Sequence, residues 1–215
     1  MLYSQPPIVR DFPDELTGAR VRVRPVRPGD GAAIYEAVEE SRELISPWLP
    51  WVEKTRSADD QEAAVRRAAA RWLLREDLMV GIWDRHTGRY LGGSGLHRID
   101  WTVPAFEIGY WLRTSAWGRG YISETVQLLC RLAFETLGAN RVEIRCDPRN
   151  IRSRAVPKRL GFVQEAHLRS NCRDGAGELR DTLIFALTPD DYARAKVLWQ
   201  GAEALKTSAL INALL

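Results

Sequence analysis

The order of hydrophobic and polar positions along the chain predicts alternating strands and helices. Valine and arginine alternate over residues 20–26, a period of two that is typical of a strand with one solvated face. A helix is expected from Asp30 to about Leu44, and a second helix from an N-cap at Ser57 to about Arg75. The first third of the chain is therefore expected to form one strand followed by two helices.

From Leu78 the pattern changes to apolar runs of strand length. Residues 78–84 and 89–99 flank the turn sequence RHTG and predict a hairpin, and residues 106–113 predict a third strand. Residues 121–137 have strong helical periodicity, and Gly138 is a typical helix stop. The middle of the chain is therefore expected to be a meander of strands that leads into a helix.

The last third of the chain repeats this alternation. Its expected elements are a strand at 141–146, a helix from Asn150 to about Leu160, strands at 161–170 and 178–187 around a polar loop at 171–177, and a final helix from about Pro189. The whole order, β-α-α-β-β-β-α-β-α-β-β-α, predicts an α/β (α+β) fold with a single domain. Its boundaries are expected to be an N-terminal extension at 1–19, the domain at 20–200 and a tail at 201–215.

Composition narrows the function classes. The chain has 215 residues, of which 45% are hydrophobic and 27% charged, so it can bury a core and is not disordered. A formal net charge of +3 is too small for an obligate nucleic-acid binder, and no direct nucleic-acid partner is expected. Only four of the 31 basic side chains are lysines, which reflects either genome composition or arginines that bind planar anions such as phosphate.

Cysteine usage and segment hydropathy bear on location and metals. The three cysteines, Cys130, Cys146 and Cys172, are odd in number and lack CxxC spacing, so neither a disulfide framework nor a metal site is expected. The N-terminal residues do not resemble a signal peptide, and no uncharged run approaches the roughly 20 residues that span a bilayer. A cytoplasmic location without a membrane partner is therefore expected.

The turn at residues 117–122, Trp-Gly-Arg-Gly-Tyr-Ile, carries the main chemical signal. Two glycines between a strand and a helix let the backbone approach a ligand, and the helix N-terminus directs unpaired N–H groups and a positive dipole end toward it. A phosphate or pyrophosphate site is one interpretation, and a turn that only serves packing is the other. Other phosphate motifs are absent: the chain has no Gly-Lys dipeptide, and Ser123 stands where G-x-G-x-x-G requires glycine.

Five segments in order resemble the GNAT superfamily of acetyl-CoA-dependent N-acetyltransferases, and within it the Rim-type ribosomal-protein serine and alanine N-acetyltransferases. These segments are RVRP in the first strand, WLPW at 48–51, IGYWL at 108–112, WGRGY at 117–121 and NIRS at 150–153. The resemblance extends from about Arg20 to Leu187. It implies a single GNAT domain with a mixed, mostly antiparallel sheet of about seven strands, flanked by helices and splayed at its central strands.

The same resemblance implies acetyl-CoA as co-substrate. In this family a loop of the form Arg/Gln-x-x-Gly-x-Gly/Ala cradles the cofactor pyrophosphate; here Gly120 fills the central glycine, while Trp117 and Ile122 replace the first and last positions. The implied cofactor-binding residues are Trp111, Leu112, Trp117, Gly118, Arg119, Gly120, Tyr121, Ile122 and Asn150. Four cations lie in or near the loops expected to face the phosphates, namely Arg119, Arg152, Arg154 and Lys158. One or two of them are expected to bind a phosphate, and a solvated surface charge is the alternative for each.

Acetyl transfer to an amine needs a neutral amine, and Glu107 is the first choice for the base that accepts its proton. Glu107 lies in an otherwise apolar strand, where partial loss of water would raise the pKa of its carboxyl group. His97, at the end of the preceding strand, is the second choice, and a water chain is the third. A solvent-facing Glu107 and a structural His97 are the alternatives.

Ser153 resembles the serine that lies beside the cofactor sulfur in the Rim-type enzymes, where it can pass a proton to the departing thiolate. Many GNAT enzymes use a tyrosine for this step, but the corresponding position here is Pro157, so the usual tyrosine acid is excluded. The alternative for both Ser153 and Asn150 is simple capping of the helix that begins there. The catalytic residues are therefore expected to be Ser153 and Glu107.

Three residues are expected to contact the acceptor: Trp48, Trp51 and His97. The two tryptophans lie in a proline-punctuated segment that can form one wall of a cleft, and the alternative is that they only close the core. The first-choice acceptor is the N-terminal amine of a ribosomal protein, and a small amine or antibiotic is the second choice. The chain is expected to act as a monomer or homodimer.

Two other function classes remain open. One is a catalytically silent acetyl-CoA-binding sensor, which Ile122 and the missing tyrosine allow. The other is an RNA-binding module built on the arginines, but these are scattered among acidic residues without an aromatic-basic pattern. Direct acetyl transfer without an acyl-enzyme is favoured, because no cysteine or serine has a paired base in the sequence pattern.

Overall fold

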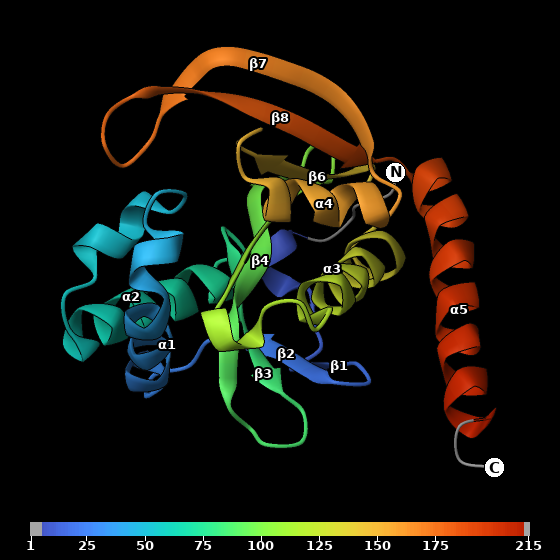
Figure 1. Cartoon of the computed structure of the whole chain (residues 1–215), viewed down its shortest axis with the longest axis horizontal. Helices are drawn as coiled ribbons and strands as arrows, with labels where there is room; N and C mark the ends of the chain where they lie inside the picture. The colour runs from blue at the N-terminus through green and yellow to red at the C-terminus, as the bar shows by residue number, and fades with distance from the viewer. Residues whose placement is uncertain (1–5, 213–215) are drawn as a thin grey trace.

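The computed structural model describes residues 6–212, with the backbone alone for 202–212, and contains one mixed sheet with helices on both faces (Figure 1). The strands are β1 (Leu16–Thr17), β2 (Val21–Pro25), β3 (Leu78–Asp84), β4 (Tyr90–Asp100), β5 (Ala105–Leu112), β6 (Arg141–Cys146), β7 (Val163–Arg173) and β8 (Leu179–Leu187). The α-helices are α1 (Gly31–Ile45), α2 (Ala58–Leu73), α3 (Tyr121–Arg131), α4 (Ile151–Arg159) and α5 (Pro189–Asn212). The α/β class and the predicted order of elements are confirmed. The strand beyond the expected seven, β1, is too short to produce a periodic pattern.

The sheet opens between its two central parallel strands. Its strand order is β1-β2-β3-β4-β5-β6-β8-β7, and β5–β6 is the parallel pair, whereas the other neighbours are antiparallel. β5 and β6 pair through Ala105–Glu107 and Arg141–Glu143 alone, although β5 continues to Leu112 and β6 to Cys146. The predicted splay of the central strands is therefore confirmed, and it leaves a V-shaped opening whose closed end is at Glu107.

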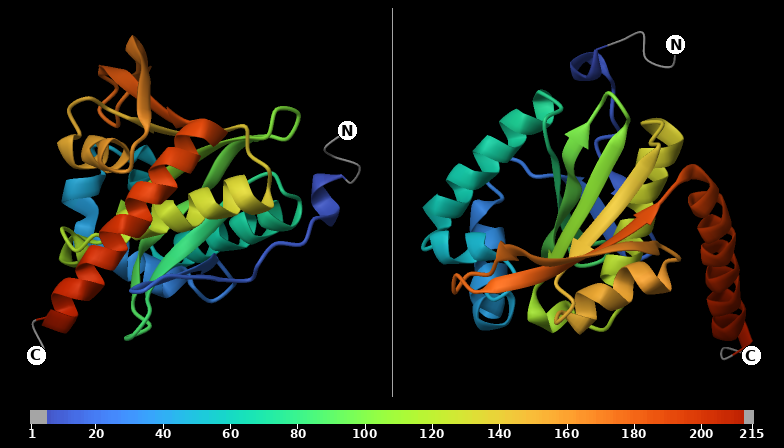
Figure 2. Two further views of the ribbon diagram at one scale, coloured as in Figure 1. Left: turned by 90° about the vertical axis from the view of Figure 1, so that its right-hand side faces the viewer. Right: turned by 90° about the horizontal axis from the view of Figure 1, so that it is seen from above.

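Helices cover both faces of this sheet (Figure 2). A hydrophobic cluster holds the helices on each face. One cluster joins the sheet to α3 and α4 and includes Val126, Leu129 and Val156. The other joins α1 and α2 to the opposite face through residues such as Ile34 and Val65. The V-shaped opening thus has a different set of helices on each side.

The helix ends follow their local sequence signals. Ser57 caps α2 by accepting a hydrogen bond from the amide of Asp60, 3.1 Å away, as its sequence position predicts. The helix expected at 121–137 is regular only to Arg131, because residues Leu132–Thr136 widen into a π-helical turn before Gly138. The predicted extent of that helix is therefore too long as a regular α-helix.

The β7–β8 hairpin is longer than its sequence suggests. β7 continues to Arg173, so the polar loop predicted at 171–177 is wrong for its first three residues. A bulge between Leu168 and Cys172 interrupts the pairing, and the amide of Ser170 donates there to the carboxylate of Asp181 at 2.8 Å. Because a bulge keeps two strands paired across an extra residue, polar residues that resemble a loop are part of the strand.

A buried arginine at the end of β5 fixes the chain that leads to the glycine turn. The Arg113 side chain is 2% exposed and donates to Glu40 at 2.8 Å and to Glu36 at 2.7 Å. The Glu40 carboxylate also accepts the Ser115 amide at 2.9 Å. Helix α1 is thereby connected to the segment between β5 and α3.

The C-terminal helix α5 continues past residue 200 to Asn212. The proposed domain boundaries at 19 and 200 remain predictions, and residues 1–5 and 213–215 lie outside the described residues. Among the helices of the described part, none is long and apolar enough to cross a membrane.

Candidate active site

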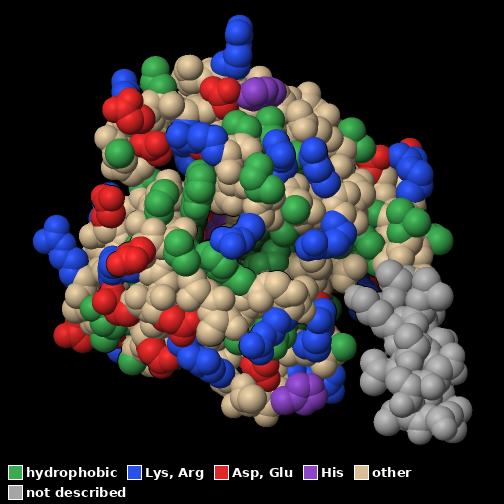
Figure 3. Space-filling model, in the orientation of Figure 1, with side chains coloured by type: hydrophobic (Ala, Val, Ile, Leu, Met, Phe, Trp, Pro, Cys, Tyr) green, Lys and Arg blue, Asp and Glu red, His purple; other side chains and the backbone are tan. Residues whose placement is uncertain are grey.

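A cleft of about 2070 Å³ follows the V-shaped opening and continues to the glycine turn. Figure 3 shows this face hollowed near its centre, with hydrophobic and basic side chains around the hollow. Of the predicted site residues, those that line the cleft are Trp48, Glu107, Trp111, Leu112, Trp117, Gly118, Arg119, Gly120, Tyr121, Ile122, Asn150 and Ser153. The cleft thus brings together nearly all predicted site residues; two, Trp51 and His97, do not line it.

The glycine turn delivers the N-terminus of α3 to this cleft. Gly118 and Gly120 have φ angles of +76° and +78°, which a residue with a Cβ adopts only with strain. α3 begins directly after them at Tyr121, so the first-turn amides, which have no intrahelical carbonyl to bind, lie at the cleft. This geometry suits a phosphate or pyrophosphate.

An ion pair from the first strand region holds the glycine turn in place. The backbone amide and Nε of Arg20 donate to the two carboxylate oxygens of Glu124, at 2.8 and 2.9 Å, and Arg20 Nη1 donates to the carbonyl of Arg119. A Cβ at position 120 would lie 3.1 Å from Arg20 Nη2, so the turn has little room for a side chain. The Arg20–Glu124 pair joins residues 104 positions apart, and no sequence pattern indicated it.

Three further basic side chains lie beside the turn. Arg119 and Arg152 line the cleft as expected, and the Arg152 guanidinium lies 4.4 Å from the centre of the Trp117 ring. Arg154 and Lys158 are not among the lining residues; Arg159 lines the cleft instead and donates to Ser123 Oγ at 2.6 Å. Arg152 and Arg159 are seven residues apart, about two helical turns, and therefore lie on the same face of α4. Arg154 and Lys158 lie on a different face of this helix.

Trp117 replaces the polar residue of the family pattern and has a local role. Its indole N–H donates to the carbonyl of Leu112 at 2.9 Å, which connects the start of the glycine turn to the last residue of β5. Its ring packs against both hydrophobic clusters. The departure from the family pattern at this position therefore leaves the turn anchored.

Ser153 lies in the first turn of α4, beside a tyrosine that the sequence analysis did not single out. The Asn150 side chain accepts the Ser153 amide at 3.0 Å, so the capping expected for Asn150 is present. Tyr110 donates from its hydroxyl to the Ser153 carbonyl at 2.9 Å, and Ser153 Oγ lies 3.4 Å from the same hydroxyl. Burial raises the pKa of Tyr110 well above its ordinary value, so the phenol is protonated at neutral pH. The one sequence feature that could have indicated Tyr110 as a site residue is its position in the IGYWL segment.

Glu107 lies at the closed end of the V. Burial raises the pKa of the Glu107 carboxyl, and the guanidinium groups of Arg98 and Arg145, at 3.3 and 4.0 Å, lower it in part. Glu107 Oε2 is buried and receives no hydrogen bond from the described residues. The sequence-based expectation of a carboxyl group with a raised pKa is therefore confirmed.

His97 is directly across the β4–β5 pair from Glu107 but does not line the cleft. Its Nδ1 lies 3.0 Å from the carboxylate of Asp77. A Cβ at Gly95, two residues earlier in the same strand, would come within 2.6 Å of the His97 ring, so this glycine leaves space for the imidazole. The structural alternative for His97 fits this environment better than acceptor contact.

The tryptophans of the WLPW segment take two different positions. Trp48 lines the cleft together with Leu49. Trp51 lies outside it and packs edge-to-face on Trp111, with ring centroids 5.7 Å apart. One tryptophan thus forms part of the cleft wall, whereas the other contacts a wall residue without lining the cleft itself.

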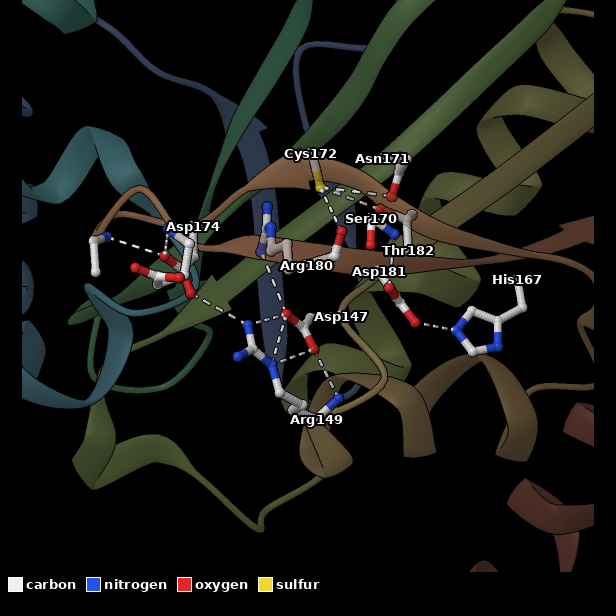
Figure 4. A network of polar contacts seen from close by, with 12 residues as sticks. Asp147, Arg149, His167, Ser170, Asn171, Cys172, Asp174, Arg180, Asp181 and Thr182 are labelled. Carbon is white, nitrogen blue, oxygen red and sulfur yellow. Dashed lines mark hydrogen bonds and ion pairs between the residues drawn. The ribbon is translucent and has the colours of Figure 1, made fainter.

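The β7–β8 hairpin covers one side of the cleft. A Cβ on Gly175 at the hairpin tip would lie 3.3 Å from Glu53 Oε1 and 3.6 Å from the Ser46 carbonyl oxygen, so the tip reaches the segment that follows α1. Four side chains of the hairpin line the cleft beneath it: Asn171, Cys172, Arg180 and Thr182 (Figure 4). Among the described residues no group of three or more His, Cys, Asp or Glu side chains could hold a metal ion.

A family model matches most of this architecture. Residues 20–163 match the model described as an acetyltransferase (GNAT) domain. The matched segment contains the glycine turn, both arms of the V and Ser153. The resemblance found in the sequence motifs is thereby supported by an independent comparison.

Comparisons with individual proteins agree with the match to the family model. The Bacillus subtilis protein named as a ribosomal N-acetyltransferase, YdaF, is 30% identical over 84% of this chain and 94% of its own length. The ribosomal-protein-serine acetyltransferase of Escherichia coli is 26% identical over 63% of this chain and 75% of its own. The solved structure of RimL, a ribosomal L7/L12 α-N-protein acetyltransferase in complex with coenzyme A, superposes with a TM-score of 0.76 at 21% identity, over 81% of this chain and 97% of that one.

Proposed function

This chain belongs to the acetyltransferase (GNAT) family, and we propose that it moves an acetyl group from acetyl-CoA directly to the N-terminal amine of a ribosomal protein. The observation that carries the proposal is the continuous cleft, which connects the N-terminus of α3 to Ser153 and Glu107. Relatives named as ribosomal-protein acetyltransferases support the choice of acceptor. Such an acceptor would place the activity in the cytoplasm.

The residues at the glycine turn fit the phosphates of acetyl-CoA. The first-turn amides of α3 and the guanidinium groups of Arg119, Arg152 and Arg159 would hold the phosphates, because they combine helix-dipole attraction with charged donors. Main-chain groups of Trp111 and Leu112 would hold the pantetheine arm along the open edge of β5. When bound there, the co-substrate supplies the acetyl group as a reactive thioester.

Glu107 would accept the proton of the acceptor ammonium. An α-amino group with a pKa near 7.8 needs far less help than a lysine near 10.4, a difference of about 3 kcal/mol in the free energy of deprotonation. Arg98 and Arg145 beside Glu107 also disfavour a positive charge on the incoming amine. A single partly buried carboxylate is sufficient for an N-terminal acceptor.

Ser153 would donate a proton to the departing thiolate. Tyr110 fixes the serine by donating to its carbonyl, and the phenol oxygen lies 3.4 Å from Ser153 Oγ, where it orients the serine hydroxyl. Water entering the cleft would return the proton that the serine gives up. This pair takes the place of the tyrosine that is excluded at Pro157. The serine acts as a general acid and forms no covalent bond in this proposal.

Direct transfer agrees with the state of the cleft cysteines. Cys146 lines the cleft, but burial raises the pKa of its thiol to about 11, which leaves little thiolate to attack a thioester at neutral pH. Cys172 is the other cysteine in the cleft wall; its sulfur lies 3.5 Å from Thr182 Oγ1, and no base contacts it among the described residues. Neither thiol has the partner that covalent catalysis requires.

The experiment that tests the proposal is a direct assay. Purified protein is incubated with acetyl-CoA and synthetic peptides that carry the N-termini of ribosomal proteins, and thiol release and peptide mass are measured. N-terminal acetylation of at least one peptide, and none of its N-terminally blocked copy, is the expected result. Turnover with small amines alone would favour the second-choice acceptor, and coenzyme A binding without turnover on any amine would favour the sensor.

A further inference from the structure

Two arginines in the part of the cleft wall formed by β6 and β8, Arg145 and Arg180, have no described carboxylate within 3.5 Å of their guanidinium groups. Arg180 on β8 has a side chain that is 20% exposed, and its nearest carboxylate is Asp147 at 4.0 Å. Its Nε is buried and donates to no acceptor among the described residues. Arg145 on β6 has contacts of 3.6 and 4.0 Å to Glu143 and Glu107. Neither guanidinium makes a hydrogen bond of normal length to the described part of the protein.

The acids near these two arginines are already held by other cations. Arg149 donates to Asp147 from Nη2 at 2.8 Å and from Nε at 3.1 Å, and its Nη2 also contacts Asp174 at 3.3 Å (Figure 4). Burial alone raises the pKa of Asp147, but the hydrogen bonds from Arg149 lower it overall, so Asp147 is ionised and paired. The donors of Arg180 are therefore left for another acceptor.

The same is true around Arg145. Arg141 binds Glu143 at 3.0 Å and Glu165 at 2.7 Å. Arg98 lies closer to Glu107 than Arg145 does, at 3.3 Å against 4.0 Å. Each acid around Arg145 thus has a nearer partner.

Both arginines project from one face of the sheet, on either side of Thr182. Arg145 is paired with Ile184, and alternate residues of a strand share a face, which places Thr182 and Arg180 on the face of Arg145. The three residues line the cleft. A carboxylate at Thr182 would lie between two guanidinium forks and beside one hydroxyl, the donor set that binds carboxylates well.

We propose that Arg145 and Arg180 select an acceptor that carries a carboxylate within the first few residues after its reactive amine, namely an acidic N-terminal peptide. This inference rests on the proposed function, because it assigns the acceptor chemistry of the same cleft. Glu107 is paired with Glu143 of β6. Asp147, which contacts Arg180, is four residues after Glu143 and directly follows the end of β6. That separation is about 13 Å, which matches about four residues of extended chain, so positions 2 to 4 of the peptide are within reach.

The test compares peptides that differ by one charge at constant shape. Peptides with Asp at position 2, 3 or 4 are assayed against the Asn isosteres, and kcat/KM is expected to be at least about tenfold higher for Asp in one of these positions, mainly through KM. In Arg180→Gln and in Arg145→Gln the Asp:Asn ratio is expected to fall toward one. Arg180→Lys is expected to keep part of the preference, because it keeps the charge without the fork.

Arg66→Gln is the matched control. Arg66 lies on α2, its side chain is 67% exposed, it pairs with Glu62, and it does not line the cleft. This variant removes the same charge and is expected to keep the full Asp:Asn ratio. A loss of the ratio in Arg66→Gln would mean that net charge rather than the wall decides selectivity, and would overturn the inference.

A binding measurement separates this inference from the proposed function. Peptide affinity for the protein in the presence of coenzyme A is followed by calorimetry, which needs no turnover. Tighter binding of the Asp peptide with no acetylation would refute the proposed function, while it would support Arg145 and Arg180 as a binding site for an acidic peptide. Acetylation of peptides with equal kcat/KM and equal affinity for Asp and Asn would leave the proposed function standing and overturn the inference.

Discussion

Tyr110 on β5 and Ser153 on α4 face each other across the open end of the V, with the tyrosine hydroxyl 2.9 Å from the serine carbonyl and 3.4 Å from the serine Oγ. The two residues are 43 positions apart in the chain. The contact fixes the first turn of α4 to the strand whose open edge would hold the pantetheine arm. It also gives Ser153 a protonated phenol as its neighbour.

Removal of the serine hydroxyl should affect turnover more than cofactor binding. Ser153→Ala is expected to lower kcat about 100-fold, the scale of a lost general acid, while the Kd for coenzyme A changes little. Steady-state kinetics and calorimetry measure the two quantities. An unchanged kcat would remove Ser153 from the mechanism.

Tyr110→Phe should act through the serine. We expect a smaller loss of kcat than in Ser153→Ala, and no further loss when Tyr110→Phe is added to Ser153→Ala, because both changes interrupt one unit. Tyr35→Phe is the matched control, since Tyr35 also donates to a backbone carbonyl, that of Arg56 at 3.0 Å, and does not line the cleft. Additive losses in the double variant would show that Tyr110 acts independently of Ser153.

Gly120→Glu should abolish coenzyme A binding. The substitution introduces a side chain at φ +78° and 3.1 Å from Arg20 Nη2, and it adds negative charge where phosphate is expected. Gly118→Ala separates strain from these effects: it has the same left-handed φ but no neighbour within 4 Å of its Cβ. Both variants should lose about 1–2 kcal/mol of unfolding free energy, whereas Gly118→Ala should retain measurable coenzyme A binding. Normal binding by Gly120→Glu would place the phosphates elsewhere.

Glu107→Gln should change the pH profile as well as the rate. A base must be deprotonated, so activity should rise with pH through the pKa of Glu107, which burial raises above its ordinary value. The Gln variant should lose this acidic limb and about 100-fold in kcat. Its melting temperature at pH 7 should not fall, because the ionised carboxylate is the form that burial destabilises. A wild-type pH profile in the variant would assign the base to another group.

The ion pairs of Arg113 should make the free energy of unfolding decrease at acidic pH. Hydrogen bonds from Arg113 lower the pKa of Glu40 to about 2, against the opposing effect of burial. The resulting stabilisation is present above the ordinary glutamate pKa and is lost as pH falls toward 2, so the urea midpoint should fall over that range. Arg113→Met should lower the unfolding free energy at pH 7 by about 1–3 kcal/mol and flatten this dependence.

Arg89→Met provides the comparison for Arg113. Arg89 contacts the same two carboxylates, Glu36 at 3.6 Å and Glu40 at 3.2 Å, but its side chain is 52% exposed. Exposed pairs contribute little, so its loss should cost at most about 1 kcal/mol. Equal effects of the two variants would contradict a special role for the buried arginine.

The order of elements and the glycine turn were predictable because they depend on neighbours in the chain. Alternation at 20–26, the Ser57 cap and the apolar run at 106–113 are local signals, and each corresponds to the element that forms there. A positive φ is possible at Gly118 and Gly120 because of their own covalent structure. Glu107 was recognisable as a candidate because it is a lone carboxylate in an apolar strand, but only the structure excluded the solvent-facing alternative.

Side-chain direction was not predictable in the same way. Trp51 lies three residues after Trp48, yet Trp48 lines the cleft whereas Trp51 lies outside it and packs on Trp111. Arg159 lines the cleft, whereas Arg154 and Lys158 do not. Such choices depend on the rotation of one segment against its neighbours. The sequence pattern contains the segment but not the packing partner.

The sequence by itself determined the α/β architecture, the glycine turn and the family resemblance, because these follow from short-range periodicity and backbone freedom. The tertiary structure alone decided which distant residues meet: Arg20 with Glu124, Tyr110 with Ser153, and Arg145 with Arg180 on one wall. Those meetings are set by strand register and by the splay of β5 from β6, which bring together residues tens of positions apart. The physical reason is that hydrogen-bonded pairing and core packing act across the chain, whereas sequence patterns report only what is adjacent along it.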